Sequence, residues 1–196
     1  NNTGSMRGCL FPDAPVWLSP ARNPDRKLKW TLEQIETPEG VLVGVNTALA
    51  NRLVREALEG GLLPGLPEWT DIRPEVRYES GSGRVDFLLT GPAGRTWVEV
   101  KNVSWVEDGR ARFPDAPTER GRKHLIELTE RVRAGENAAM VFCVQRGDAR
   151  TFEPADDVDP ETATATGALA LGLANDLSPV GIRGSGTLPI RTGENI

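Results

Sequence analysis

The segment VDFLLTGPAGRTWVEVKN, residues 85–102, most constrains what this chain can fold into. Its apolar runs and its central Gly-Pro-Ala-Gly predict two antiparallel strands joined by a turn. Both strands nevertheless carry charged side chains, Asp86 in the first and Glu99 and Lys101 in the second. The hairpin therefore has to accommodate two carboxylates and one ammonium group where a core would need apolar side chains.

The expected register brings the two carboxylates together. Because side chains alternate along a strand, Glu99 shares one face with Lys101, and Asp86 shares one face with Leu88. If residues 91–94 form the loop, Asp86 lies opposite Glu99. Two like charges paired in this way cost roughly 0.2–1 kcal/mol, and more when they are partly desolvated.

Two explanations account for these charges. In the first, Arg84 and Lys101 offset the repulsion and the four residues form a salt-bridge cluster. In the second, Asp86 and Glu99 bind a divalent cation, because their oxygens are hard ligands that suit Mg²⁺ or Mn²⁺. Lys101 then orients a water molecule or stabilises charge on a phosphoryl oxygen. This spacing matches D-x(n)-(D/E)-x-K, a motif typical of one large nuclease superfamily.

The composition predicts a folded domain and excludes some classes of site. The chain has 196 residues, 38% hydrophobic and 26% charged, enough for a packed core. With neither an apolar run of membrane-spanning length nor a signal-peptide pattern, we expect a cytoplasmic protein with no membrane partner. The net charge of −5 argues against a nonspecific polyanion binder, although residues 22–29 and 120–124 are basic. The single histidine, His124, excludes a His-rich zinc site and is expected on a helix surface.

Hydrophobic periodicity and capping residues predict the order of the elements. The expected strands are residues 15–18, 28–36, 41–45, 75–79, 84–90, 96–103 and 138–144, and the expected helices are residues 47–59 and 119–134. The end of the chain is expected to contain a helical stretch near 160–172 and strands around ALALGL and GIRGSGTLPI. Helix, antiparallel strands, helix and buried strand in this order predict an α/β layer structure.

Several segments together resemble the sugar fermentation stimulation protein (SfsA) family. They are NTGSMRG (2–8), NPDRKLKWTLE (23–33), GVNTALANRLVREAL (44–58), RVDFLL, VEVKNV, FPDAPTERGRKHL (113–125) and FCVQR (142–146). The resemblance implies an α/β (α+β) chain in which residues 41–196 form a PD-(D/E)xK restriction-endonuclease-like domain, with a mixed central sheet flanked by helices. Residues 1–40 are then a partial OB-fold-like segment, because family members have further strands before NTGSMRG.

The resemblance also implies functional residues. Asp86, Glu99 and Lys101 match the nuclease motif and are the expected catalytic residues, with Asp86 and Glu99 as ligands of Mg or Mn. Glu56 is a further candidate ligand, because the first helix often supplies one in nucleases of this fold. The alternative is that Glu56 is an ordinary exposed helix residue.

Two basic segments are candidates for binding DNA, the expected partner. The start of the second expected helix attracts phosphate and offers a hydroxyl and three cations: Thr118, Arg120, Arg122 and Lys123. An OB-like strand and the turn before it mix cations with an aromatic ring: Arg26, Lys27, Lys29 and Trp30. In each case the alternative is a solvated charged surface, with Trp30 in the core.

Three functions stay open at this point. The first is a Mg- or Mn-dependent nuclease, and the second is a non-catalytic DNA-binding regulator of sugar (maltose) metabolism built on a nuclease-like fold. The third, an enzyme acting on a small phosphorylated ligand, is disfavoured because no phosphate-cradling glycine motif is present. The sequence leaves the oligomeric state open, a homodimer included.

Overall fold

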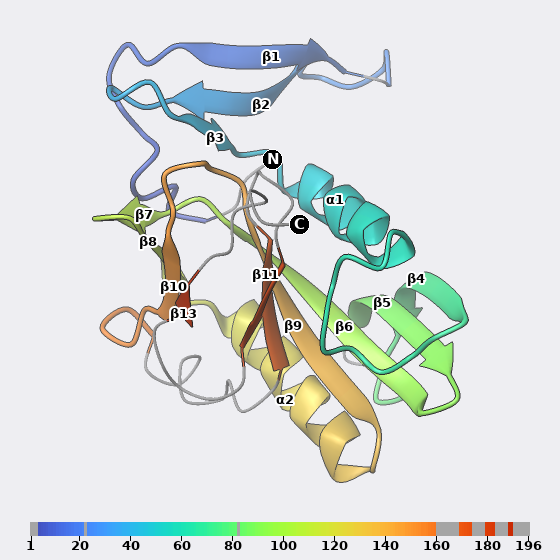
Figure 1. Cartoon of the computed structure of the whole chain (residues 1–196). Helices are drawn as coiled ribbons and strands as arrows, with labels where there is room; N and C mark the ends of the chain where they lie inside the picture. The colour runs from blue at the N-terminus through green and yellow to red at the C-terminus, as the bar shows by residue number, and fades with distance from the viewer. Residues whose placement is uncertain are drawn as a thin grey trace.

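A mixed six-stranded sheet forms the centre of the fold, with one helix on each face (Figure 1). The computed structural model describes residues 4–21, 23–81 and 83–159, and the backbone of residues 169–173, 179–182 and 188–189. The order of the strands in this sheet is β12 (Pro179–Ile182), β11 (Leu169–Leu173), β9 (Asn137–Val144), β6 (Gly94–Val103), β5 (Arg84–Gly91) and β4 (Asp71–Arg77). The expected mixed sheet flanked by helices is confirmed.

Both helices begin where capping residues predict. Helix α1 (Thr47–Glu59) begins after Asn46, whose side chain accepts a hydrogen bond from the backbone N–H of Ala48. Helix α2 (Glu119–Arg133) begins after Thr118, whose hydroxyl accepts from the N–H of Gly121 at 3.0 Å. These side chains satisfy N–H groups that have no partner within the first turn of a helix.

The two faces of the sheet pack in separate apolar clusters. In β6, Trp97 packs in the cluster that contains Leu125 and Leu128 of α2. Val98, its neighbour in sequence, packs in the cluster that contains Val54 of α1. Alternation along β6 therefore directs successive side chains toward opposite helices, so Glu99 lies on the α2 face.

The hairpin has the expected register but a shorter loop. Leu88 pairs with Trp97 and Gly91 pairs with Gly94, so Pro92 and Ala93 alone connect the strands. Paired positions continue only as far as Phe87 and Val98. Asp86 and Glu99 lie just beyond this ladder, where the strands separate.

Asp86 interrupts the alternation of β5. Leu88 packs on the α2 side and Phe87 on the α1 side, as alternation requires, yet Val85 packs with Leu88. The strand therefore changes face between Val85 and Phe87. The expectation that Asp86 shares a face with Leu88 is wrong, since its carboxylate binds Asn51 of α1.

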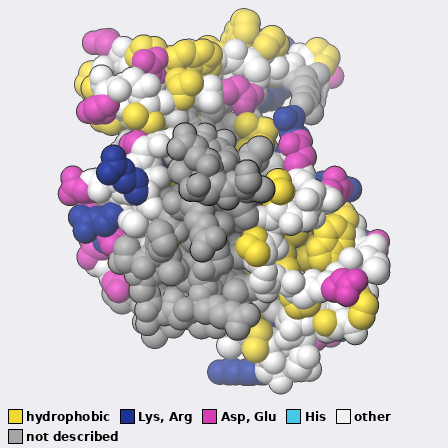
Figure 2. Space-filling model, in the orientation of Figure 1, with side chains coloured by type: hydrophobic (Ala, Val, Ile, Leu, Met, Phe, Trp, Pro, Cys, Tyr) yellow, Lys and Arg dark blue, Asp and Glu magenta, His cyan; other side chains and the backbone are white. Residues whose placement is uncertain are grey.

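A separate three-stranded sheet precedes α1 and comprises β1 (Val16–Pro20), β2 (Trp30–Glu36) and β3 (Leu42–Gly44). Because β3 pairs with β2, this sheet continues past residue 40, the expected boundary. Its inner face is a small core with Ile35 and Val43. Its outer face leaves apolar side chains exposed, and Figure 2 shows hydrophobic atoms gathered over this end of the molecule.

A small third sheet was not expected from the sequence, apart from its last strand within GIRGSGTLPI. Its order is β13 (Leu188–Pro189), β10 (Thr151–Pro154), β8 (Arg110–Phe113) and β7 (Val106–Glu107). Of the helical stretch expected near 160–172, residues 160–168 lie outside the described residues, and residues 169–172 belong to strand β11 instead. The strand expected around ALALGL is confirmed. Within the part of the chain that the structure describes, no helix is both long and apolar enough for a membrane span.

Gly91 provides a test of the packing beneath the hairpin. A Cβ at Gly91 would lie 2.3 Å from the carbonyl oxygen of Glu68 and 2.6 Å from the Cα of Trp69. Gly91→Ala must therefore displace backbone atoms, and we expect it to lower the free energy of unfolding by about 1–3 kcal/mol. Gly147→Ala is the matched control, because nothing lies within 4 Å of the position that its added methyl group would occupy. Urea denaturation of both variants checks this, and equal stabilities would contradict it.

Candidate functional site

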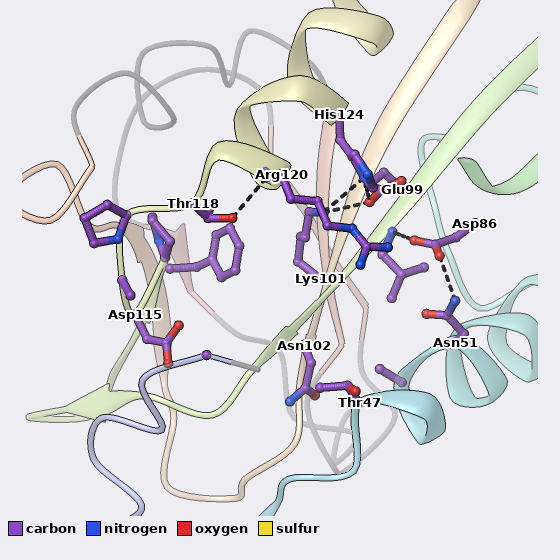
Figure 3. Close-up of a pocket in the computed structure, with 18 residues that line it drawn as sticks. Thr47, Asn51, Asp86, Glu99, Lys101, Asn102, Asp115, Thr118, Arg120 and His124 are labelled. Atoms are coloured by element: carbon purple, nitrogen blue, oxygen red, sulfur yellow. Dashed lines mark hydrogen bonds and ion pairs between the residues drawn. The ribbon is translucent and has the colours of Figure 1, made fainter. Parts of the chain in front are cut away.

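A cavity of about 350 Å³ opens where β6 passes between the first turns of α1 and α2 (Figure 3). All three residues of the expected nuclease motif line it, together with fifteen other residues. The lining residues are Gly4, Thr47, Ala50, Asn51, Asp86, Glu99, Val100, Lys101, Asn102, Phe113, Pro114, Asp115, Ala116, Pro117, Thr118, Arg120, Gly121 and His124. The structure therefore brings Asp86, Glu99 and Lys101 to one solvent-open site.

Glu99 is the deepest acid of the cavity, and its residue is only 2% exposed. Its Oε1 accepts a hydrogen bond from Lys101 Nζ at 2.7 Å and contacts His124 Nδ1. Burial acts to raise the pKa of Glu99, but the hydrogen bond from His124 and the charge of Lys101 outweigh it and lower the pKa. Oε2 is buried and has no hydrogen-bond partner among the described residues.

Asp86 is held by donors from two directions. Its Oδ1 accepts from Asn51 Nδ2 at 2.8 Å, and its Oδ2 accepts from the backbone N–H of Val100 at 2.7 Å. Burial and then the negative charge of Glu99 raise the pKa of Asp86, and the two hydrogen bonds only partly offset them. The two carboxylates thus repel each other across the cavity.

The donor set fits a hard divalent cation that keeps much of its water. The orphaned Oε2 of Glu99 is a buried anionic oxygen without a partner in the described chain, and such an oxygen is costly unless something binds it. The described residues contain no group of three or more His, Cys, Asp or Glu that could hold a metal. Two carboxylates suit Mg²⁺ or Mn²⁺, which complete their coordination with water and phosphate oxygens.

His124 is the residue that the sequence misplaced. It was expected on a helix surface, but its side chain is only 13% exposed and lies against Glu99, with Nδ1 3.5 Å from Lys101 Nζ. A signal was present, since His124 follows Gly121 by three residues and precedes Leu128 by four, and both of these residues are buried. On a helix of 3.6 residues per turn, these positions share one face.

Glu56, the third expected metal ligand, does not reach the cavity. Its side chain is 61% exposed and pairs with Arg52, with Nε and Oε1 3.3 Å apart. Glu56 lies two positions after the buried Val54, which is about 200° around the helix. Asn51, nearly one turn before Val54, lines the cavity in its place and binds Asp86.

The expected DNA-binding residues of α2 divide into two pairs. Thr118 and Arg120 line the cavity, and Figure 3 shows Arg120 extending from the first turn of α2. Arg122 and Lys123 do not line it. Arg122 Nη2 lies 3.9 Å from Asp159 Oδ1, and Lys123 is exposed on the helix surface.

The expected DNA-binding residues of the N-terminal sheet lie apart from the cavity. Arg26 donates to Thr31 Oγ1 at 2.8 Å, and Lys29 donates to the carbonyl of Pro24 at 2.6 Å. Lys27 is exposed, and Trp30 is 57% exposed rather than in a core. Whether these side chains contact nucleic acid stays a proposal.

Two family models together cover most of the chain. The SfsA N-terminal OB domain matches residues 1–45, and the "Sugar fermentation stimulation protein RE domain" matches residues 48–171. The first of these matches places the end of the OB segment at the end of the β1–β3 sheet. The fold is therefore an OB-type segment followed by a restriction-endonuclease-like domain.

Individual relatives give the same result. The chain is 49% identical over 195 residues to the sugar fermentation stimulation protein homolog of Geobacter metallireducens, covering 96% of this chain and 84% of that protein. It is 54% identical over 173 residues to the homolog of Halorhodospira halophila, covering 86% and 72%. Among solved structures, Pyrococcus furiosus SfsA in complex with Ca²⁺ matches with a TM-score of 0.78 and 26% identity, covering 95% of this chain and 83% of that one. The chain belongs to the sugar fermentation stimulation protein (SfsA) family.

Proposed function

We propose that this protein binds DNA and hydrolyses its phosphodiester bonds at the cavity between α1 and α2, with Mg²⁺ or Mn²⁺. The observation that carries the proposal is the convergence of Asp86, Glu99 and Lys101 on one open cavity, with Glu99 Oε2 unpartnered among the described residues. A salt-bridge cluster alone would leave no reason for this buried oxygen. The Ca²⁺ bound by the solved relative supports a divalent cation here.

Each side chain then has a distinct task. Asp86 and Glu99 would hold the metal, which would supply a water molecule of lowered pKa and polarise a phosphate oxygen. Lys101 lies beside the phosphate and stabilises its developing negative charge. His124 fixes the carboxylate of Glu99 through Oε1, which leaves Oε2 available to hold a metal. Asn51 and the backbone N–H of Val100 fix the carboxylate of Asp86.

The surroundings of the cavity favour a nucleic acid as the substrate. Arg120 and the N–H groups at the start of α2 attract phosphate at the cavity itself. The OB-type segment adds a second surface, where the exposed Trp30 and nearby cations suit stacking on bases and contact with a backbone. A polymer that spans both surfaces explains why the two units occur in one chain. We assign this activity to the cytoplasm.

Metal removal and an Asp86 variant test the proposal. We expect supercoiled plasmid to be nicked with Mg²⁺ or Mn²⁺ and to stay intact with excess EDTA. Asp86→Asn keeps the shape of the side chain and removes its charge, so about 10–100-fold more metal should be needed for half-maximal cleavage. Asp71→Asn, in an exposed ion pair on β4, is the control. Cleavage that persists in EDTA contradicts the proposal.

A second function is supported by a specific observation. Glu99 Oε1 already binds Lys101 and His124, and no third acid joins the pair within the described residues. This arrangement also suits a fold that holds DNA without turnover, as a regulator of sugar (maltose) metabolism genes would. Gel-shift binding without nicking in any divalent cation would favour this function over the nuclease.

A further inference from the structure

A polar pair lies beside the proposed catalytic residues on the other face of the sheet. Asn102 directly follows Lys101 in β6, and its side chain lines the cavity near Thr47 (Figure 3). Gln145 follows the last residue of the parallel strand β9, and its Nε2 donates to Asn102 Oδ1 at 2.5 Å. Ligands of sheets with parallel strands bind beyond the carboxyl ends of those strands, which is where this pair lies.

Gln145 is itself held in place. The residue is 3% exposed, its N–H donates to the carbonyl of Val103, and its carbonyl accepts from the N–H of Gly44 at 2.7 Å. Gly44 also lies against the side chain, since a Cβ there would come within 2.6 Å of Oε1. Strand β3 therefore closes over Gln145 and leaves its amide little freedom to rotate.

This fixed hydrogen bond orients the amide of Asn102. A side-chain amide has one acceptor oxygen and one NH₂ donor group. Because the oxygen of Asn102 is bound to Gln145, its NH₂ group is directed away from Gln145, and Asn102 is one of the residues that line the cavity. No described residue accepts a hydrogen bond from this NH₂ group, so it is free to bind a ligand oxygen.

Asp115, an acid that also lines the cavity, already binds the N-terminal segment. Asp115 Oδ2 accepts from Ser5 Oγ at 3.0 Å and from the N–H of Met6 at 2.9 Å. The N-terminal segment therefore occupies Oδ2 of this carboxylate. Two cations, Lys101 and Arg120, line the same cavity as Asn102, together with the proposed metal ligands Asp86 and Glu99. A ligand that satisfies Asn102 and both cations is an anion with several oxygens.

We propose that the side-chain NH₂ of Asn102 binds a phosphate oxygen of the nucleic acid next to the cleaved phosphodiester, and that Gln145 is the residue that positions it. The choice of ligand rests on the proposed function. Asn102 is thus a substrate-binding residue beside the D…ExK motif, and Gln145 acts only through it.

The probe for this contact is a 5′-phosphorylated thymidine dinucleotide in the presence of Ca²⁺. In a ¹⁵N-labelled protein, the side-chain NH₂ signal of Asn102 is assigned by its loss in Asn102→Ala, and it should shift when the probe is added. Asn102→Ala should weaken binding of the probe about 10-fold or more, as expected for a hydrogen bond to a charged group. Asn137→Ala is the control, since that amide donates to the carbonyls of Ala93 and Arg95 at the opposite end of β9.

Variants of Gln145 distinguish positioning from a structural role. The carboxylate introduced by Gln145→Glu accepts from Asn102 but cannot donate to it, so the amide of Asn102 turns and presents its oxygen to the phosphate. Gln145→Met removes the hydrogen bond and leaves the amide free to rotate. Binding should therefore weaken about as much in Gln145→Glu as in Asn102→Ala, and only a few-fold in Gln145→Met. Melting temperatures identify any variant that fails to fold.

Three results would overturn the inference: a wild type that does not bind the probe, an Asn102 signal that does not shift, or binding in Asn102→Ala within twofold of wild type. A different result concerns only the proposed function. If the probe binds through Asn102 but plasmid is never nicked with Mg²⁺ or Mn²⁺, the nuclease assignment fails and the phosphate contact stands.

Discussion

Lys101→Met should lower the rate of metal-dependent DNA cleavage about 10²- to 10³-fold, the range found when one preorganised donor to a transition state is removed. Lys101 Nζ is 2.7 Å from Glu99 Oε1, and its side chain is only 14% exposed. Its charge is therefore fixed at the cavity and shielded from water, where an electrostatic contact is strong. Methionine keeps an unbranched side chain of similar volume, so the loss should come from chemistry rather than from folding.

Two comparisons separate a loss of chemistry in Lys101→Met from a general loss of positive charge and from a loss of DNA binding. Arg73→Met removes one positive charge from an exposed side chain on β4, outside the cavity, and should cleave within about twofold of wild type. Gel shifts in Ca²⁺ should show that Lys101→Met still binds DNA, because Arg120 and the start of α2 remain. If Lys101→Met cleaves as fast as wild type, the role assigned to Lys101 is wrong.

The sequence predicts most of the helices and strands around this site, because their positions depend on patterns among residues that are close in the chain. Capping side chains and a repeating apolar stripe determine where α1 and α2 begin, and both depend only on residues within a few positions. The register of the β5–β6 hairpin followed from its glycines and from alternation. The placement of Glu99 and Lys101 on one face follows from the same period of two.

The positions of the remaining site residues depend on tertiary contacts, which the periodicity of a strand or helix alone does not predict. Asp86 leaves the regular ladder, and its position depends on Asn51 and on the N–H of Val100. Glu56 is a candidate ligand in the sequence because the first helix often supplies one in nucleases of this fold, although the helical period directs it away from Val54. His124 was assigned to the surface because its neighbours in sequence are charged. In both cases the position of the residue around the helix, relative to the buried residues, predicts the observed exposure better.

Asn102 and Gln145 show a further limit. Each polar residue lies near the end of a strand, where polar side chains are common and carry no signal of their own. These two side chains come into contact because β6 pairs in parallel with β9, which brings the ends of the two strands together. Parallel neighbours are separated along the chain by a whole crossover, so this pairing cannot be read from a local pattern.

The largest effect on stability is expected at Arg146, whose side chain hydrogen-bonds to Gly8 of the N-terminal segment, to Ser104 after β6 and to Asp148 in its own segment. The residue is 4% exposed, and its guanidinium donates to the carbonyls of Gly8 at 3.1 Å and Ser104 at 2.8 Å. It also makes two hydrogen bonds to Asp148, at 2.7 and 2.6 Å. All three partners lose donors when Arg146 is removed, and two of them are backbone carbonyls that water reaches poorly.

Arg146→Met should therefore lower the free energy of unfolding by about 2–4 kcal/mol, because it leaves two backbone carbonyls without a donor and the partly exposed Asp148 without its cation. For a chain of this size the melting temperature should fall by roughly 10 °C. Arg150→Met removes an exposed arginine from the next turn of chain and should change stability by no more than about 0.5 kcal/mol. Urea denaturation measures both variants, and a loss below about 1 kcal/mol in Arg146→Met would show that the N-terminal segment is held by other contacts. Because that segment also supplies Gly4 and Ser5 to the cavity wall and to Asp115, its release should weaken DNA binding as well.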